Sequence, residues 1–237
     1  MARIFPFRAY RYAANIDPVS VLTQPYDKIT PEMQSRYAAA SPFNLITIEK
    51  GLAQPSDSPS NNVYTRAAAA FESWIAKGVL VRDTEPSMYA YAQTYAVPGP
   101  PAANAAKRET RVGLIALGQL EDYSAGVIFR HEQTLSGPKA DRLELLRHTR
   151  AHTGQLFMIY DDPSKRVDSI LAQAAAAPPV TQLTDEFRVG HRLFRIDQPD
   201  QIAEIQRALA SQKLVIADGH HRYETALAYR NERRAAA

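Results

Sequence analysis

The sequence contains no cysteine, which excludes disulfide bonds, thiolate metal sites and cysteine nucleophiles. It also has no apolar run near the roughly 20 residues that span a bilayer, and residues 1–7 lack the long apolar segment of a secretory signal. A large excess of one charge is missing as well, because the formal net charge of +3 is too small by itself to indicate nucleic-acid binding. We therefore expect a cytoplasmic protein without a membrane or nucleic-acid partner.

The composition is that of a globular protein. At 237 residues, with 45% hydrophobic and 22% charged residues, the chain can form a core without disulfides or metals. Residues 88–97 and 110–120 predict an antiparallel strand pair joined by a loop at 98–107, and strands alternate with helices further along. The expected fold class is α/β (mixed α+β), with a mixed sheet, antiparallel hairpins in the first half and strand-helix alternation in the second.

The chain is described in two parts, which are expected to form one continuous globular unit. Residues 1–125 predict an amino-terminal α+β part, in which residues 45–49 are assigned to a strand. Residues 126–237 predict an α/β part that carries the main polar motifs. The last residues, 233–237, lie inside a helical pattern without a stop signal, so we expect a longer parent chain.

A buried strand that turns directly into a helix is predicted at residues 214–229. The apolar run 214–217 is typical of a buried strand, and the polar cluster that follows opens a helix. Such a corner leaves several backbone N–H groups without partners at the start of the helix, all pointing the same way. It therefore favours the binding of an anion, above all phosphate.

The residues at this corner suit phosphate chemistry. Gly219 lets the backbone approach a ligand, Arg222 offers a two-pronged donor, and Asp218 is able to bind a metal or accept a proton. His220 and His221 titrate near neutral pH. The alternative is structural: an N-cap aspartate, a tight-turn glycine and a solvated first helical turn.

A second polar cluster follows the apolar residues 127–129. His131 and Glu132 occupy a strand end there, as Asp218 does at the other corner. Lys139 and Arg142 lie near the start of the next helix, where basic residues oppose the helix dipole, so a carboxylate or phosphate partner would explain them. The alternative is a surface helix whose charges pair locally with acidic neighbours.

Residues 25–28, Pro-Tyr-Asp-Lys, are a further candidate. Proline forces an extended or turning backbone, which leaves Tyr26 and Asp27 at a loop, either as reserve site residues or as ordinary turn residues.

Several separated motifs, in this order, resemble the amino-terminal part of an uncharacterised prokaryotic family, the domain-of-unknown-function family 1015. Members of that family are usually longer, so the resemblance implies a missing carboxy-terminal domain that could complete the site. The motifs are Phe5-Pro6-Phe7-Arg8-Ala9, Pro25-Tyr26-Asp27, Ser41-Pro42-Phe43-Asn44-Leu45, Arg130-His131-Glu132, Lys139-Ala140-Asp141-Arg142 and Ala217-Asp218-Gly219-His220-His221-Arg222-Tyr223.

The last motif is also similar to the nucleotide-binding motif of the ParB, sulfiredoxin and free serine kinase superfamily, which implies a ParB/sulfiredoxin-like element at the carboxy terminus. Sulfiredoxins have Gly-Gly-Cys-His-Arg at this place, ParB proteins Gly-Glu-Arg-Arg and ADP-dependent free serine kinases Asp-Gly-His-Thr-Arg. The string at 218–222 matches the kinase pattern at four of five positions, with His221 in place of threonine. The absence of cysteine excludes sulfiredoxin chemistry, and the absence of the Glu-Arg pair weakens a ParB-type CTP switch.

Three functions are expected from these residues together with the resemblance of the last motif. The first is a nucleotide-binding enzyme, with Mg²⁺ and ATP or ADP as cofactors, that transfers a phosphoryl group to a small hydroxylated metabolite such as serine; Asp218 and Glu132 are the magnesium candidates. The second is a metal-dependent hydrolase in which His131, Glu132, Asp218, His220 and His221 gather around one ion. The third is a non-enzymatic, ParB-like nucleotide-binding regulator. A homodimer is compatible with all three.

Overall fold

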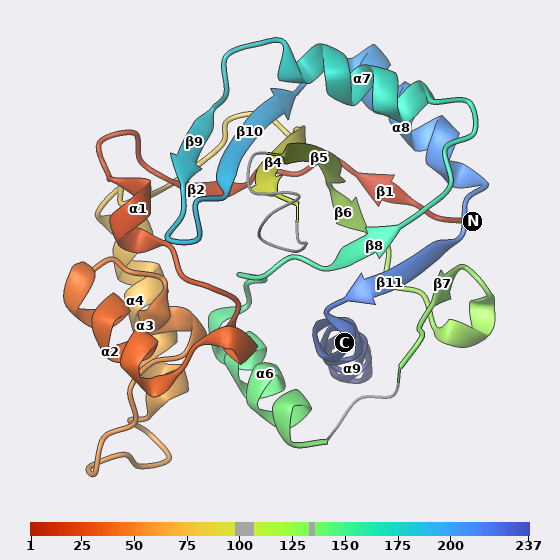
Figure 1. Cartoon of the computed structure of the whole chain (residues 1–237). Helices are drawn as coiled ribbons and strands as arrows, with labels where there is room; N and C mark the ends of the chain where they lie inside the picture. Colours follow the sequence, from red (N-terminus) through yellow and green to blue (C-terminus); the bar gives the residue numbers. More distant parts are fainter. Residues whose placement is uncertain (98–106, 133–135) are drawn as a thin grey trace. The chain divides into compact units, whose positions relative to one another are not determined.

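The computed structural model describes residues 1–97, 107–132 and 136–237, and the predicted loop at 98–107 falls almost wholly outside this range (Figure 1). The chain forms two compact units, each built from three segments. The first unit contains residues 1–9, 82–119 and 161–213, and the second contains residues 10–81, 120–160 and 214–237. Each unit therefore takes residues from both of the predicted parts. The mixed α/β class is confirmed.

The first unit is built on an antiparallel sheet of strand order β5-β4-β10-β9. Its hairpin of β4 (Met88–Ala96) and β5 (Arg108–Ile115) confirms the predicted strand pair. The other two strands are β9 (Thr181–Thr184) and β10 (Gly190–Ile196). A short ladder joins β1 (Ile4–Phe5) to β6 (Leu117–Gly118).

Alternation along β4 and β10 creates the core of this unit. Because successive side chains point to opposite faces of a strand, Ala90, Ala92 and Phe194 lie on one face, where they are buried. Helix α7 (Arg166–Ala175) packs on the sheet and on α8 (Pro199–Ala210).

A buried carboxylate connects three elements of the same unit. Asp83 is 5% exposed, and Arg195 Nη2 donates to its Oδ1 over 2.8 Å. The Tyr89 hydroxyl donates to its other oxygen, and Arg8 Nε donates to its backbone carbonyl over 2.8 Å. This network joins the amino-terminal segment to β4 and β10.

The second unit is mainly helical. Its helices are α1 (Pro18–Val21), η1 (Tyr26–Lys28), α2 (Pro31–Ala40), α3 (Ile46–Glu49), α4 (Val63–Ala76), η2 (Tyr123–Ala125), α6 (Ser136–Thr149) and α9 (His220–Ala235). Trp74 of α4, Ile48 of α3 and Leu145 of α6 form its main apolar core. A small ladder joins β2 (Tyr10–Tyr12) to β3 (Leu80–Arg82). Among the described residues, no helix combines the length and the apolar character that a membrane crossing requires.

The prediction of a strand at residues 45–49 is wrong, because α3 occupies this segment. The cause is the side chain of Asn44, which is 1% exposed. Its Oδ1 accepts from Ile46 N over 2.9 Å, and its amide donates to Ser20 O over 2.8 Å. These bonds hold the backbone at residue 44 in a turn. The segment that follows therefore forms one helical turn, although isoleucine and threonine favour β-strands.

A three-stranded sheet with the order β7-β11-β8 positions the polar motifs of this unit. β11 (Leu214–Asp218) is its central strand, parallel to β7 (Ile128–Phe129) and antiparallel to β8 (Phe157–Ile159). The predicted strand followed by a helix at 214–229 is confirmed, since α9 begins two residues after β11 ends.

Candidate functional site

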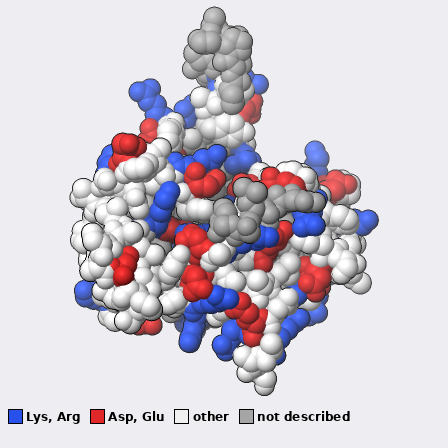
Figure 2. Space-filling model, turned by 90° about the horizontal axis from the view of Figure 1, so that it is seen from below, with Lys and Arg blue, Asp and Glu red and all other residues white. Residues whose placement is uncertain are grey.

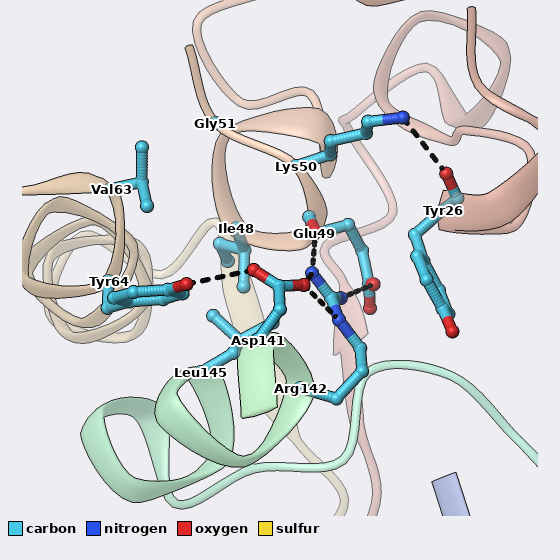
Figure 3. Close-up of a pocket in the computed structure, with 10 residues that line it drawn as sticks. All are labelled: Tyr26, Ile48, Glu49, Lys50, Gly51, Val63, Tyr64, Asp141, Arg142 and Leu145. Atoms are coloured by element: carbon cyan, nitrogen blue, oxygen red, sulfur yellow. Dashed lines mark hydrogen bonds and ion pairs between the residues drawn. The ribbon is translucent and has the colours of Figure 1, made fainter. Parts of the chain in front are cut away.

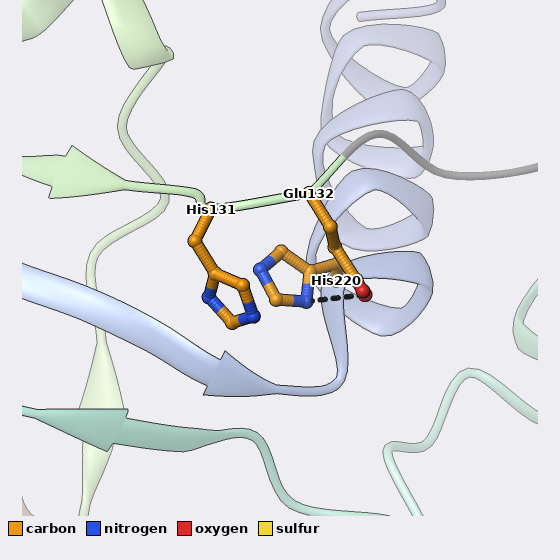
Figure 4. Close-up of side chains that lie close together, drawn as sticks. All are labelled: His131, Glu132 and His220. Carbon is orange, nitrogen blue, oxygen red and sulfur yellow. Dashed lines mark ion pairs between the residues drawn. The ribbon is translucent and has the colours of Figure 1, made fainter.

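Residues of both polar clusters predicted from the sequence lie at the same edge of the β7-β11-β8 sheet. Because β7 and β11 are parallel neighbours, their carboxyl ends face the same side. His131 and Glu132 follow β7, and His220 is the first residue of α9, which follows β11. These three side chains form a compact group, which we call the histidine cluster (Figure 4).

Distances within the histidine cluster are short. The imidazole rings of His131 and His220 meet edge to face, with centroids 4.6 Å apart and planes at 88°. Glu132 Oε1 lies 2.8 Å from His220 Nδ1. This contact does not have the alignment of a hydrogen bond, and Nε2 also makes no hydrogen bond among the described residues. His220 is nevertheless only 1% exposed. The buried imidazole of His220 therefore lacks the hydrogen bonds that buried polar groups usually make.

The other two members of the histidine cluster are accessible. His131 is exposed, and the side chain of Glu132 is 54% exposed. His131 Nδ1 lies 2.8 Å from the carbonyl oxygen of Ile216 on β11. Because a carbonyl only accepts, Nδ1 carries the proton, and the Nε2 of the neutral ring is left with its lone pair.

The start of α9 has the geometry expected for an anion site. Gly219 is the N-cap, with φ +92° and ψ +28°, and contributes no capping side chain. The conformation is left-handed, so glycine is the residue that adopts it without strain. His221 is half-buried in the first turn. Helix-internal bonding leaves the first-turn amides without carbonyl partners, and the helix dipole adds partial positive charge there.

Arg222 lies folded across the two glycines of this corner. A Cβ on Gly154 would lie 2.9 Å from its Nη1, and a Cβ on Gly219 would lie 2.9 Å from its Nε. Its Nη2 donates to Asp218 Oδ2 over 2.7 Å, and its Nε is buried without a hydrogen bond among the described residues. The side chain of Asp218 is 67% exposed. The guanidinium of Arg222 is thus fixed at the start of α9, and its Nη2 already donates to Asp218.

Lys139 is held against α9 by a protein carboxylate. Its Nζ donates to Glu224 Oε2 over 2.8 Å, and Arg130 lies 3.2 Å from the other oxygen of Glu224. Glu224 is four residues after His220 and so lies on the same face of α9. Sequence reasoning did not select Glu224, although this spacing is the signal that could have found it.

Arg142 lines a pocket of about 280 Å³ that shares no residue with the histidine cluster (Figure 3). Its Nη1 donates to Glu49 Oε2 over 3.1 Å, and its Nε donates to Asp141 Oδ2 over 2.9 Å. The Arg142 side chain is only 10% exposed. The sequence suggested either a carboxylate ligand or a local acidic neighbour as the partner of Arg142. The structure shows two protein carboxylates in this role, the distant Glu49 and the adjacent Asp141. Glu49 was missed because its segment was assigned to a strand.

Tyr26 also lines this pocket. The Arg142 guanidinium lies 4.3 Å from the centre of its ring. Burial raises the pKa of its hydroxyl, and the positive charges of Arg142 and Arg222 oppose that increase. Asp27, the other reserve residue, is exposed.

Alkaline pH offers a test of the packing around Tyr64, whose hydroxyl donates to Asp141 Oδ1 over 2.9 Å. Burial and this carboxylate raise the pKa of Tyr64 from 10.0 to about 12. The folded state therefore holds the phenolic proton more tightly than the unfolded state, and this contribution to stability is lost as the pH rises from 10 towards 12. We expect Tyr64→Phe to unfold with a weaker pH dependence in this window, measured by urea denaturation. Equal pH dependence in both proteins would contradict the assignment.

Comparison with family models agrees with the resemblance to family 1015. No curated protein and no solved structure matches this chain. A family model described as "Protein of unknown function (DUF1015)" matches residues 4–237, a range that includes the histidine cluster, the α9 corner and Tyr26. Since the match covers nearly the whole chain, the protein belongs to the DUF1015 family.

Proposed function

We propose that this protein is a nucleotide-binding enzyme that transfers a phosphoryl group to a small hydroxylated metabolite. One observation carries the proposal: the anion-favouring start of α9 and the carboxylate and histidine that follow β7 lie at one sheet edge. Phosphoryl transfer depends mainly on positioning and on stabilising negative charge, so such a convergence suits it.

In this proposal the phosphates bind at the first turn of α9. The amides there provide several donors, and Arg222 adds a fixed positive charge. Its buried Nε gains an acceptor when a phosphate oxygen binds. Lys139 and His221 are further donors close to the same helix end, although the ammonium of Lys139 is shared with Glu224.

The chemical step moves the terminal phosphoryl group of ATP or ADP to the acceptor. The bond from the acceptor oxygen to phosphorus forms, and the bond from phosphorus to the bridging oxygen of the nucleotide breaks. Asp218, exposed at the corner, takes the hydroxyl proton or holds Mg²⁺, and Glu132 is the other magnesium candidate. His220 or His221, in the first turn of α9, donates to the transferring group. The reaction belongs in the cytoplasm, where nucleotides are available.

The proposed class of acceptor molecule is inferred from the Asp-Gly-His-His-Arg motif at residues 218–222. Its similarity to the free serine kinase motif supports a small hydroxylated amino acid such as serine. The pocket beside Tyr26 and Arg142, with its volume of about 280 Å³, is large enough for a molecule of that size.

Calorimetric titration tests this function. With Mg²⁺ present, we expect ATP or ADP to bind the wild-type chain and to bind Arg222→Ala at least about tenfold more weakly, because a hydrogen bond to a charged group contributes roughly 1.5–3 kcal/mol. Asp218→Asn should bind nucleotide but lose transfer to serine. The matched control is Arg233→Ala, an exposed arginine in the last turn of the same helix.

Two outcomes would change the conclusion. If ATP, ADP and CTP all fail to bind at about 1 mM, the proposal is wrong. If a nucleotide binds with the expected dependence on Arg222 but no phosphoryl group moves, the ParB-like regulator replaces the enzyme.

A further inference from the structure

The histidine cluster has the composition of a metal centre. His131, Glu132 and His220 each offer one ligand atom, and these atoms all lie within 4.8 Å of one another. Two imidazoles and one carboxylate form a ligand set used for divalent transition metals, with positions left open for water or substrate. The three side chains come from two segments of the second unit that the parallel pairing of β7 and β11 holds together (Figure 4).

The hydrogen bond of His131 prepares that residue for metal binding. With Nδ1–H directed at the carbonyl of Ile216, 2.8 Å away, the ring is fixed in the tautomer whose Nε2 is free to coordinate. Metal-binding histidines usually donate their second ring N–H to a carbonyl or a carboxylate in this way, because the bond fixes both the tautomer and the orientation of the ring.

His220 provides the second observation. Its ring is 1% exposed, and neither of its nitrogens makes a hydrogen bond among the described residues. Nδ1 at least contacts Glu132 Oε1 at 2.8 Å, whereas a buried nitrogen such as Nε2 that makes no hydrogen bond costs about 1–3 kcal/mol, so native structures rarely keep one without a reason. Coordination of a metal would satisfy a nitrogen of this ring, and Glu132 would balance part of the positive charge.

Of the described acidic side chains around this sheet edge, Glu132 is paired with a histidine. Three basic side chains of the same motifs are engaged by other acids: Lys139 and Arg130 by Glu224, and Arg222 by Asp218. The carboxylate of Glu132 is therefore directed to the histidine, and with its 54% exposure an ion from solvent can reach it.

We propose that His131, Glu132 and His220 bind one divalent transition-metal ion, with Zn²⁺ or Mn²⁺ as the probes. This inference does not depend on nucleotide binding. A bound metal would stand at the same sheet edge as the α9 corner, where it would either assist phosphoryl transfer or activate a water, as the metal-dependent hydrolase requires.

The test uses metal alone. The purified chain is stripped with a chelator, dialysed and titrated with ZnCl₂ or MnCl₂ by calorimetry without nucleotide, and the melting temperature is measured in parallel. We expect one ion per chain, a higher melting temperature, and binding at least about tenfold weaker in His131→Ala and Glu132→Gln. Both substitutions affect exposed side chains, so the variants should fold. His148→Ala, a half-buried histidine of α6, is the matched control.

Cobalt gives a readout independent of stability. Co²⁺ bound through imidazole and carboxylate should absorb visible light in the wild type and in His148→Ala, and this absorption should be lost in His131→Ala. The proposal is overturned if neither Zn²⁺ nor Mn²⁺ binds more tightly than about 1 mM, or if His131→Ala and Glu132→Gln bind as the wild type does. Nucleotide titrations in Mg²⁺ without transition metal separate this failure from failure of the phosphoryl-transfer proposal.

Discussion

Alanine at position 219 should weaken nucleotide binding by roughly ten- to a hundredfold, the loss expected when hydrogen bonds to a charged group are removed. The new Cβ would lie 2.9 Å from Arg222 Nε and 3.0 Å from both Arg222 Nη2 and Leu156 Cδ2. The flexible guanidinium must move away, and the positive charge leaves the start of α9. Titration of ATP and ADP measures the change.

The same substitution should also lower the free energy of unfolding, by about 1–2 kcal/mol, because a side chain is strained at the φ of +92°. Gly126→Ala is the matched control: its φ is +65°, and nothing lies within 4 Å of the added Cβ. It should lose a similar amount of stability and keep the nucleotide affinity of the wild type. Equal affinities in the two variants would show that Arg222 does not contribute to binding.

Loss of the Asp83 side chain should be the most destabilising change among those considered, at about 2–4 kcal/mol, because it removes a buried carboxylate that accepts from the Tyr89 hydroxyl and from the half-buried Arg195 guanidinium. Asp83→Ala removes the acceptor of both Arg195 and the Tyr89 hydroxyl, and Arg195 Nε is already buried without a hydrogen bond among the described residues. Chemical denaturation followed by circular dichroism measures the loss.

Two further variants make this prediction specific. Asp83→Asn keeps an acceptor for Tyr89 but removes the charge, so its loss should be intermediate. Asp197→Ala is the matched control, since this exposed aspartate of the same unit accepts from the neighbouring Gln198 side chain. If Asp83→Ala unfolds at the same denaturant concentration as Asp197→Ala, the network does not stabilise the first unit.

The sequence predicted the strand and helix around Gly219 better than it predicted which charged side chains pair. Residues 214–229 combine an apolar run, a glycine and a helical pattern, so the strand, the turn and the helix were all visible. The convergence with His131 and Glu132 depended on β7 and β11 being parallel neighbours, which periodicity does not reveal. Two polar clusters at strand ends could be recognised, but their distance from each other could not.

The sequence alone could not predict which acidic side chains pair with the basic residues of the motifs. Arg142 pairs with Glu49, 93 residues away, and Lys139 with Glu224, 85 residues away. Such partners are set by tertiary packing, so separation along the chain carries no signal for them. Gly154, which makes room for Arg222, was missed for the same reason. At residues 45–49 a buried asparagine overrode β propensity, and a side-chain bond of that kind has no periodicity.

On the face shown in Figure 2, basic and acidic side chains are interspersed over the surface. This distribution agrees with the small net charge of +3. Charge at the candidate site is therefore a local property, produced by the few side chains around α9.

The alternation of the chain between its two units has a consequence for biosynthesis. The polypeptide passes from one unit to the other after residues 9, 81, 119, 160 and 213. The last of these passages delivers β11, the strand that separates β7 from β8, together with α9. A nascent chain that still lacks its final segment holds His131 and Glu132 but has no partner strand for them. The histidine cluster is thus assembled only after translation of this region is complete, and the many non-local pairings predict slow maturation of the newly made protein.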